Sequence, residues 1–335
     1  MRVAQVKEFG GPEALVTAEV PDPVAGPGSV VVDIAAIDTI FVETQIRAGA
    51  FSEHFPARTP YVPGGGIAGT VRAVGDGVDA AWTGRRVITS LGFGGGYAEQ
   101  AVAPAAKLVP VPDGLPLEVA AALVHDGVTA GALLESTGLG AGDQVLILGA
   151  SGGMGTLLVQ LAKAAGAKVV GVARGERKAS LVRELGADAV VDAAAGTAVG
   201  TAGDVSGDDW TVRVRTALGP AGADVVLDGV GGEVGLAAFP LTADGGRFSA
   251  HGAPTGGFAP VDPSDAARRG IKLLGIADVQ LSDEEYVRLA ARALEVAASG
   301  SLRPVIGATF PLERAAEAHR AIEGRELVGK VLLRP

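Results

Sequence analysis

The sequence predicts an α/β protein in which a β-rich region precedes a doubly wound, six-stranded parallel sheet. Two observations carry this prediction. Residues 1–122 contain short apolar or alternating runs separated by Pro/Gly turns, a pattern typical of β-strands. From residue 143 to about 276, apolar strand-like runs alternate with helical ones, as in a parallel sheet with crossover helices.

The elements follow in chain order. The first region has a strand near 1–6 and further strands at 30–36, 66–74 and 86–90. A long apolar helical stretch covers 119–134, with an interruption near His125-Asp126-Gly127. The six strands of the parallel sheet are expected at 144–149, 168–173, 189–191, 224–228, 245–250 and 271–276.

The last part of the chain repeats a strand–helix–strand pattern after the sheet is complete. An amphipathic helix is expected at 283–298, a strand near 305–310, a helix at 313–323 and a final strand at 330–333. The Gly/Asp/Thr-rich segment 196–209 is expected to be a surface loop. The simplest topology returns the tail to the first domain, which then spans 1–124 and 277–335, around a nucleotide domain at 125–276.

A glycine cluster between a strand and a helix points to a dinucleotide. Gly149, Gly152, Gly153 and Gly155 follow strand 144–149 and precede a helical run at 156–165. Glycines allow a tight turn and close approach of a pyrophosphate, and the helix N-terminus offers free N–H groups. This is the Rossmann βαβ pattern, with Ser151, Gly152, Gly153 and Met154 expected at the pyrophosphate.

The residues after the second strand predict which dinucleotide binds. Arg174-Gly175-Glu176-Arg177-Lys178 stand where an NAD-binding fold has an acidic residue for the ribose 2′-hydroxyl. Arg174, Arg177 and Lys178 offer a 2′-phosphate both charge and hydrogen-bond donors, so NADPH is the expected cofactor. The alternative is a solvated basic start to a helix at 176–185.

Composition narrows the class of protein. The 335 residues suffice for two domains, and the net charge of −10 argues against a nucleic-acid partner. No apolar run of about 18 residues and no export signal is seen, so a cytoplasmic protein without a membrane span is expected. The absence of cysteine excludes disulfides and thiolate metal sites.

Six segments in order resemble the medium-chain dehydrogenase/reductase superfamily, and within it the zinc-free quinone oxidoreductase branch. The resemblance implies a GroES-like catalytic domain plus a Rossmann domain, NADPH, reduction of quinones or other conjugated carbonyls, and a homodimer. Strand 271–276, near the end of the sheet, could pair across its two-fold axis. The matching segments are the glycine turn 149–155; Glu43-Thr44-Gln45-Ile46-Arg47-Ala48-Gly49; Pro63-Gly64, Ala68-Gly69 and Val74-Gly75; Leu185-Gly186-Ala187-Asp188; Asp228-Gly229-Val230-Gly231-Gly232; and Phe310-Pro311-Leu312-Glu313 through Gly329-Lys330.

The same resemblance implies a site without metal. Zinc-dependent relatives carry His-Glu where this chain has Gly65-Gly66, and a cysteine near Ile40. These three residues supply none of the N, S or O ligands that Zn²⁺ needs. Hydride addition to a C=C bond conjugated with a carbonyl is therefore expected rather than alcohol oxidation.

The resemblance also implies contacts to the nicotinamide end of the cofactor. Thr129 is expected to bond the carboxamide, or else to bond a helix carbonyl. Val230, His251 and Gly252 are expected beside the nicotinamide ring, with His251 in place of the family's usual aromatic residue. Lys330 is expected at the cofactor phosphates, or else on an edge strand.

No side chain is assigned as the catalytic proton donor. The candidates beside the substrate are Asp38, Gln45, which replaces the family's tyrosine, Arg47 and His251. His125-Asp126 depart from the family's more apolar sequence and mark either a functional dyad or a capped helix break. The alternatives to a quinone or enone reductase are an enoyl-thioester reductase and a non-catalytic NADPH-binding protein.

Overall fold

The structure is a computed structural model that describes residues 1–50, 57–194 and 210–335. These residues form two compact units, one made of Met1–Val128 with Leu281–Pro335 and the other of Thr129–Gln280. The sequence prediction had put these boundaries at 124/125 and 276/277. The surface loop expected at 196–209 lies outside the described residues.

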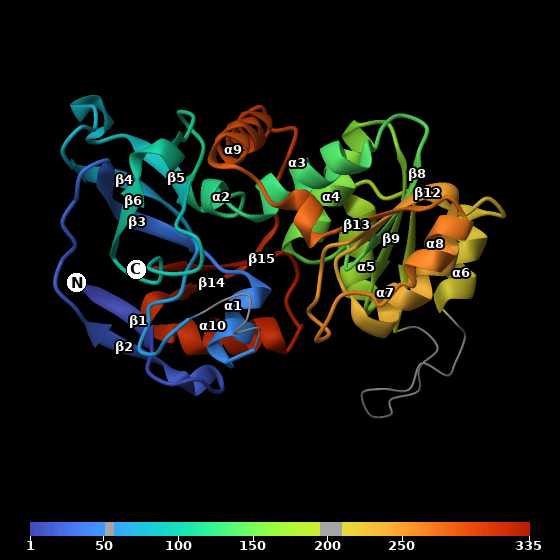
Figure 1. The fold of residues 1–335 in the computed structure, drawn as a ribbon, viewed down its shortest axis with the longest axis horizontal. Helices are drawn as coiled ribbons and strands as arrows, with labels where there is room; N and C mark the ends of the chain where they lie inside the picture. Colours follow the sequence, from blue (N-terminus) through green and yellow to red (C-terminus); the bar gives the residue numbers. More distant parts are fainter. Residues whose placement is uncertain (51–56, 195–209) are drawn as a thin grey trace. The chain divides into compact units, whose positions relative to one another are not determined.

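The described part of the second unit is built on a six-stranded sheet in the order β10-β9-β8-β11-β12-β13 (Figure 1). Every neighbouring pair runs parallel, so the predicted six-stranded doubly wound sheet is confirmed. The strands are β8 Gln144–Leu148, β9 Lys168–Ala173, β10 Ala189–Asp192, β11 Ala223–Asp228, β12 Thr242–Ala250 and β13 Lys272–Gly275.

Helices cover both faces of this sheet. A Cβ added at Gly171 of β9 would lie 2.7 Å from Val182 Cγ1, so α5 packs closely on one face. The neighbouring Val170 and Val172 point the other way and share a hydrophobic cluster with Trp210 of α6. The helices of this unit are α4 Gly153–Ala164, α5 Glu176–Glu184, α6 Trp210–Leu218, α7 Gly232–Ala238 and α8 Pro263–Arg268, with short 3-10 turns η4 Phe239–Leu241 and η5 Ile276–Val279.

The first unit is mostly β-structure (Figure 1). Its seven-stranded sheet runs β14-β15-β3-β4-β5-β7 with β6 also paired to β3, and β1 and β2 form a separate antiparallel pair. The strands are β1 Arg2–Val6, β2 Leu15–Glu19, β3 Ser29–Asp38, β4 Gly66–Val74, β5 Arg86–Ser90, β6 Gln100–Pro104, β7 Val109–Pro110, β14 Ile306–Pro311 and β15 Lys330–Arg334.

The tail of the chain lies in the same sheet as the N-terminal strands. β15 sits between β14 and β3, and Leu332 pairs with Asp38. Lys330 is therefore on an interior strand, and the edge-strand reading of this lysine is wrong. The helices in the described part of this unit are α1 Phe41–Arg47, α2 Leu117–Ala121, α9 Asp283–Ala298 and α10 Ala315–Glu323. Helix α3 Asp126–Thr137 begins in this unit and continues into the second. The 3-10 turns are η1 Pro12–Ala14, η2 Ala80–Trp82, η3 Ala105–Lys107 and η6 Leu312–Arg314.

Two predicted helices differ from the structure at their ends. The expected helix 119–134 is two helices, α2 and α3, and the break covers Ala122–His125 rather than 125–127. Helix α4 begins at Gly153, three residues earlier than expected, because Thr156 N already donates to Gly152 O at 2.9 Å. The first helical turn therefore includes part of the glycine cluster.

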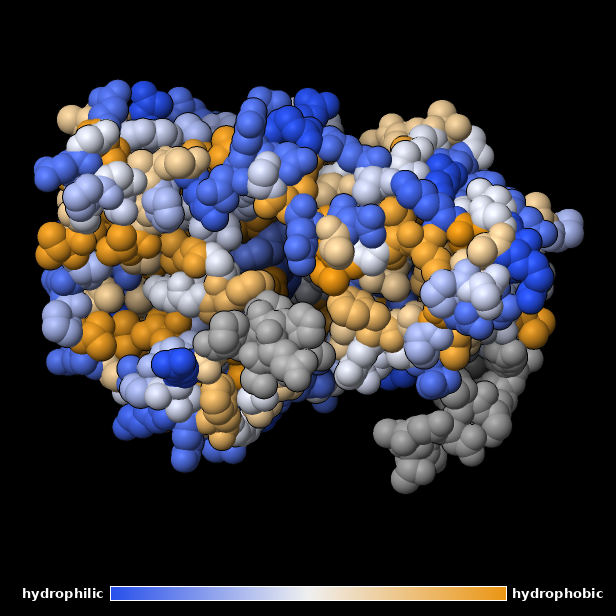
Figure 2. Space-filling view, viewed as in Figure 1, coloured by the Kyte–Doolittle hydropathy of each residue, from blue (hydrophilic) through white to orange (hydrophobic). Residues whose placement is uncertain are grey.

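The described surface carries scattered apolar residues. Figure 2 shows apolar and hydrophilic residues interspersed on the visible face. Large exposed apolar side chains include Phe9, Val24 and Phe258, from different parts of the chain. Within the described ranges, no helix combines the length and apolar character required to cross a membrane.

Candidate functional site

The glycine turn between β8 and α4 closes very tightly. Gly149 adopts a φ of +68°, and its carbonyl accepts from Gly152 N at 3.0 Å. A Cβ added at Gly155 would lie 2.2 Å from Gly149 O and 2.8 Å from Ala150 Cα, so only glycine fits there. The turn delivers the chain directly into α4.

The N-terminus of α4 is open to an anion. No side chain caps this helix among the described residues, so the first-turn N–H groups of Gly153 and Met154 are available. Gly152 is exposed, and a Cβ there would meet nothing closer than 3.4 Å, while Ser151 is 8% exposed beside it. A helix dipole and free N–H groups favour a phosphate at this place.

The basic segment after β9 presents two exposed guanidinium groups, Arg174 and Arg177, with Lys178 half-buried. Gly175, at a φ of +81°, donates its N–H to Asp192 Oδ1 at 2.7 Å, which holds the loop. Glu176 pairs with Arg183 at 2.6 Å, one helical turn or more away from Arg174. The acid of the segment is thus engaged elsewhere, and the side chains of Arg174 and Arg177 are exposed to solvent.

The carboxyl ends of β11 and β12 meet in a close backbone contact. His251 N and Gly252 N both donate to Asp228 O, at 3.1 and 3.0 Å. Asp228 Oδ1 accepts from Val230 N at 2.9 Å. A Cβ at Gly252 would lie 2.2 Å from Gly229 O, so the two loops pack backbone on backbone.

His251 is a neutral imidazole in this setting. Its side chain is 7% exposed, and Nδ1 lies 3.3 Å from Ser249 Oγ. Burial lowers the pKa of His251 to about 4, so the ring carries no charge at neutral pH. Thr129 is half-buried in α3.

Four charged side chains meet at the end of β3 in the first unit; we call them the Asp38 cluster. Asp38 is fully buried, and Oδ2 accepts from His125 Nδ1 at 2.7 Å and from His125 N at 3.3 Å. Lys330 forms ion pairs with Asp38 and, at 3.1 Å, with Asp126. The sequence suggested Asp38, Lys330 and the pair His125-Asp126 separately, and the structure brings all four side chains together.

The pKa directions in the Asp38 cluster follow from burial against charge. Burial opposes ionisation of Asp38, but Lys330 and His125 outweigh it and lower the pKa of this carboxyl. For Asp126 burial outweighs Lys330, and the pKa is raised. Burial also opposes the charge of Lys330, yet Asp126 and Asp38 raise its pKa.

A second polar network is buried beneath α1. Glu43 is 1% exposed and accepts from Tyr97 Oη at 2.8 Å and from Gly65 N at 2.9 Å. Burial raises the pKa of Glu43, against the hydrogen bonds that it accepts from Ile40 N and Tyr97. Glu43 was part of a motif in the sequence but was not singled out as a site residue.

Arg47 belongs to the same buried network and does not face an open substrate site, although the sequence suggested a place beside the substrate. Its side chain is 2% exposed, pairs with Glu323 at 2.6 Å and donates to Gly10 O at 3.1 Å. The guanidinium is held in the core because α10 supplies this acid from far along the chain. Gln45, on the same helix, is half-buried, and its backbone carbonyl accepts from Ala50 N at 2.9 Å.

His319 links the two ends of this network. Its Nε2 lies 2.9 Å from Tyr97 Oη and its Nδ1 lies 3.3 Å from Arg47. Burial, with a smaller effect of Arg47, lowers the pKa of His319 to about 3. The ring is fully buried.

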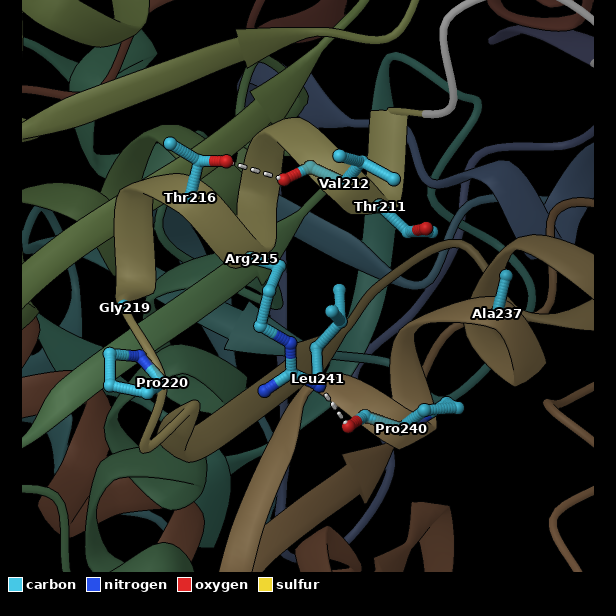
Figure 3. A pocket seen from close by; sticks show the side chains of 9 residues that line it. All are labelled: Thr211, Val212, Arg215, Thr216, Gly219, Pro220, Ala237, Pro240 and Leu241. Atoms are coloured by element: carbon cyan, nitrogen blue, oxygen red, sulfur yellow. Dashed lines mark hydrogen bonds between the residues drawn. The ribbon is translucent and has the colours of Figure 1, made fainter.

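A cavity of about 550 Å³ lies elsewhere in the second unit (Figure 3). Gly219 and Pro220 line it just before β11, and Pro240 and Leu241 just before β12. These are the amino ends of the strands, whereas the glycine turn lies at a carboxyl end. The cavity is therefore on the opposite edge of the sheet from the glycine turn between β8 and α4. Within the described residues, no three or more His, Cys, Asp or Glu side chains gather as metal ligands would.

Comparisons with known proteins cover the whole chain. Residues 26–113 match the family model of the alcohol dehydrogenase GroES-like domain, and residues 153–295 match that of the zinc-binding dehydrogenase. Human quinone oxidoreductase is 33% identical over 99% of this chain and 97% of its own length. A 2-haloacrylate reductase from Burkholderia is 32% identical over 99% and 98%. A mycobacterial protein solved in complex with NADPH superposes with a TM-score of 0.89 at 34% identity, over all of both chains.

Proposed function

The chain belongs to the quinone oxidoreductase branch of the medium-chain dehydrogenase/reductase superfamily, and from this premise we propose that it reduces quinones or other conjugated carbonyls with NADPH. The observation that carries the proposal is the pairing of an uncapped glycine turn with exposed cations after β9. This pairing suits a dinucleotide that bears a 2′-phosphate.

The cofactor would be held by three groups of residues. The pyrophosphate would bind at the turn and first helical residues of α4, and the 2′-phosphate would bind the cations of the basic segment. The backbone contact between the ends of β11 and β12 would form the floor beneath the nicotinamide. When bound, NADPH supplies a hydride. The residues concerned are Thr129, Ser151, Gly152, Gly153, Met154, Arg174, Arg177, Lys178, Val230, His251 and Gly252.

Lys330 is not assigned to the cofactor phosphates. Its ammonium is 5% exposed and is engaged by two carboxylates, Asp38 and Asp126. Moving it to a phosphate would leave both acids buried without a counter-charge, which is costly. We assign Lys330 to holding the Asp38 cluster together.

The reaction proposed needs no metal. Ile40, Gly65 and Gly66 carry no side-chain N, S or O at the positions where zinc-dependent relatives have ligands. What this chain can contribute is orientation of the acceptor, shielding from water and a proton for the oxygen that gains charge. Positioning alone is a large source of rate enhancement.

A panel of acceptors tests the proposal. NADPH with a benzoquinone, an alkenal and crotonyl-CoA should give turnover on the quinone or the alkenal, and NADH should be a poorer donor. Turnover on crotonyl-CoA alone would assign the chain to the enoyl-thioester reductases instead. NADPH binding without turnover on any of them would favour a non-catalytic role.

A second candidate is a reductase of electron-poor alkenes that are not ketones or quinones. The full-length similarity to a 2-haloacrylate reductase supports it. Adding an α-halogenated acrylate to the same panel separates the two, because a quinone reductase should prefer the quinone by a large factor in kcat/KM.

We also propose that the protein is a homodimer. β13 is an edge strand of the parallel sheet in the described chain, and Ile276 just after it is 41% exposed. An edge strand offers unpaired backbone groups to a second copy. Sedimentation should give twice the chain mass of 33.3 kDa, and a monomer at micromolar concentration would contradict it.

A further inference from the structure

We propose that His125, oriented by Asp38, donates the proton that the substrate oxygen takes up as the hydride arrives. This role rests on the proposed reductase function and deepens it. The sequence predicts that His125-Asp126 form either a functional dyad or a capped helix break. The structure shows that they belong to a built group of four side chains from three elements and the break between α2 and α3.

Asp38 holds the imidazole at two points. Its Oδ2 accepts from the backbone N of His125 at 3.3 Å and from ring Nδ1 at 2.7 Å. The bond from Nδ1–H directs the ring so that any further proton sits on Nε2. Nε2 has no hydrogen-bond partner among the described residues, and 21% of the side chain remains exposed. A proton on Nε2 therefore points away from the buried carboxylate.

The other described histidines differ in the feature that matters. Both ring nitrogens of His319 are engaged, by Tyr97 and Arg47, and the ring is fully buried. His251 is buried with a lowered pKa, so its ring is neutral at pH 7 and lacks the second ring proton that an imidazolium could donate. His125 alone among these three combines a carboxylate partner, partial exposure and an open nitrogen.

Charge around His125 supports its protonated form. Burial opposes the charge, but the hydrogen bond and charge of Asp38 outweigh it and raise the pKa of His125. Glu43 on α1 acts in the same direction, and Lys330 on β15 acts against it. Asp126, next in sequence, completes the set of charged groups that face the ring.

Two glycines make room for the ring. A Cβ at Gly66 would lie 2.8 Å from His125 Cε1 and 2.9 Å from Nδ1. A Cβ at Gly65 would lie 3.2 Å from the same Cε1 and 2.1 Å from Gly92 O. The imidazole thus lies against the backbone at the two positions where zinc-dependent relatives have His-Glu. A Brønsted acid sits where those relatives have ligands for a Lewis acid.

The step balances without a further reactant. The hydride from NADPH forms a C–H bond at the β-carbon, and NADP⁺ is left. The C=C electron pair moves toward the carbonyl, whose oxygen gains negative charge. The Nε2–H bond of His125 breaks and an O–H bond forms, which gives the enol. From a quinone the same two events give the hydroxy-dienone tautomer, which becomes the hydroquinone when its β-carbon loses a proton to water and its second oxygen gains one from water. The neutral imidazole then takes a proton from solvent, which its exposed edge allows.

Two acceptors of different basicity test the role within one enzyme. An enone gives a strongly basic enolate oxygen that needs an acid, whereas an electron-poor quinone gives a weakly basic one that does not. His125→Gln should lower kcat for the enone about 100-fold and for the quinone less than about 10-fold, with NADPH affinity unchanged. The matched control His319→Gln removes a buried imidazole of the same unit and should lower both rates by one common factor.

An NMR titration of the cofactor-free protein tests the positioning role of Asp38 without turnover. The His125 imidazole, assigned by its loss in H125Q, should titrate above the usual value of about 6.5. Asp38→Asn should move that titration down. In the enzyme it should move the alkaline limb of the enone pH profile down by the same amount.

The outcomes separate the two proposals. Equal losses on both acceptors in H125Q, or a His125 that titrates at or below the usual value, would refute the proton donor while leaving the reductase intact. A wild-type protein that reduces no acceptor would refute the proposed function, and the proton donor with it.

Discussion

Replacing Lys330 with Met removes an ammonium that contacts both Asp38 and Asp126. Asp38 is fully buried, the Asp126 side chain is 10% exposed and Lys330 is 5% exposed, so water replaces little of what is lost. Asp38 keeps His125 as a partner, whereas Asp126 has no second cation at ion-pair distance among the residues that the structure describes. The variant therefore separates a structural role for Lys330 from the phosphate contact suggested by the sequence.

The size of the effect follows from the geometry. Across the 3.1 Å between Lys330 and Asp126, one ion pair at an effective dielectric of about 20 corresponds to about 5 kcal/mol of attraction. The desolvation of the ammonium offsets part of it, and protonation of Asp126 limits the rest. Removing one partner of a buried pair costs about 3–5 kcal/mol, and we expect Lys330→Met to lie in that range.

The pH dependence has a definite sign. The raised pKa of Lys330 gives stability that is present below its usual 10.5 and is lost as pH rises through the folded value. The lowered pKa of Asp38 gives stability that is present above 3.8 and is lost as pH falls through the folded value. Without the ammonium both carboxyl pKa values rise. The deficit of the variant should be largest near pH 7 and should shrink as pH falls toward about 4.

Urea unfolding followed by circular dichroism measures the deficit, and NADPH fluorescence measures affinity. Lys107→Met is the control, since Lys107 pairs with Asp283 at 2.8 Å with side chains 29% and 63% exposed. It should cost less than about 1 kcal/mol. An unchanged urea midpoint for Lys330→Met, together with a large loss of NADPH affinity, would refute the structural reading and restore the phosphate contact.

Three further variants test other parts of the account. Arg174→Ala should raise KM for NADPH about 10-fold and leave KM for NADH within about 2-fold, because one charge-assisted hydrogen bond at an exposed site is lost. The control Arg292→Ala removes another exposed arginine and should change neither KM. Equal effects on the two cofactors would contradict the 2′-phosphate assignment. Gly155→Ala places a Cβ 2.2 Å from Gly149 O, so the affinity for NADPH and the midpoint of thermal unfolding should both fall. A variant that binds NADPH with unchanged affinity would contradict the assignment of the glycine turn to the pyrophosphate. Tyr97→Phe leaves buried Glu43 one donor short and should cost about 1–3 kcal/mol in thermal unfolding at pH 7, less at acid pH, where a neutral Glu43 needs that donor less.

Short-range patterns were enough to predict much of the second unit. All six strands of its sheet were expected within a few residues, because buried parallel strands are short apolar runs between glycines and helices. The glycine turn and the basic segment are likewise contiguous in sequence. The start of β12 was expected three residues too late, at 245, because β12 begins at Thr242, before the apolar part of the strand.

The polar groups of the first unit could not be predicted in the same way. Asp38, His125 and Lys330 come from β3, the break before α3, and β15, and only the pairing of β15 with β3 brings them together. Arg47 was expected beside the substrate because the sequence around this arginine carries no sign of its partner, Glu323, which comes from α10. The sequence did carry a local signal for Glu43. This residue is the third of helix α1, a position where a glutamate can accept from the backbone N–H of the N-cap residue, here Ile40.

The fate of a labelled hydride tests the central claim most directly. NADPH carrying two deuterium atoms at C4 should transfer one of them to the β-carbon of an enone in ordinary water, as mass spectrometry of the product would show. The same reaction with unlabelled NADPH in D₂O should leave that carbon free of deuterium. A β-carbon hydrogen that comes from solvent, or a product with no label from NADPH, would contradict direct hydride transfer by this protein.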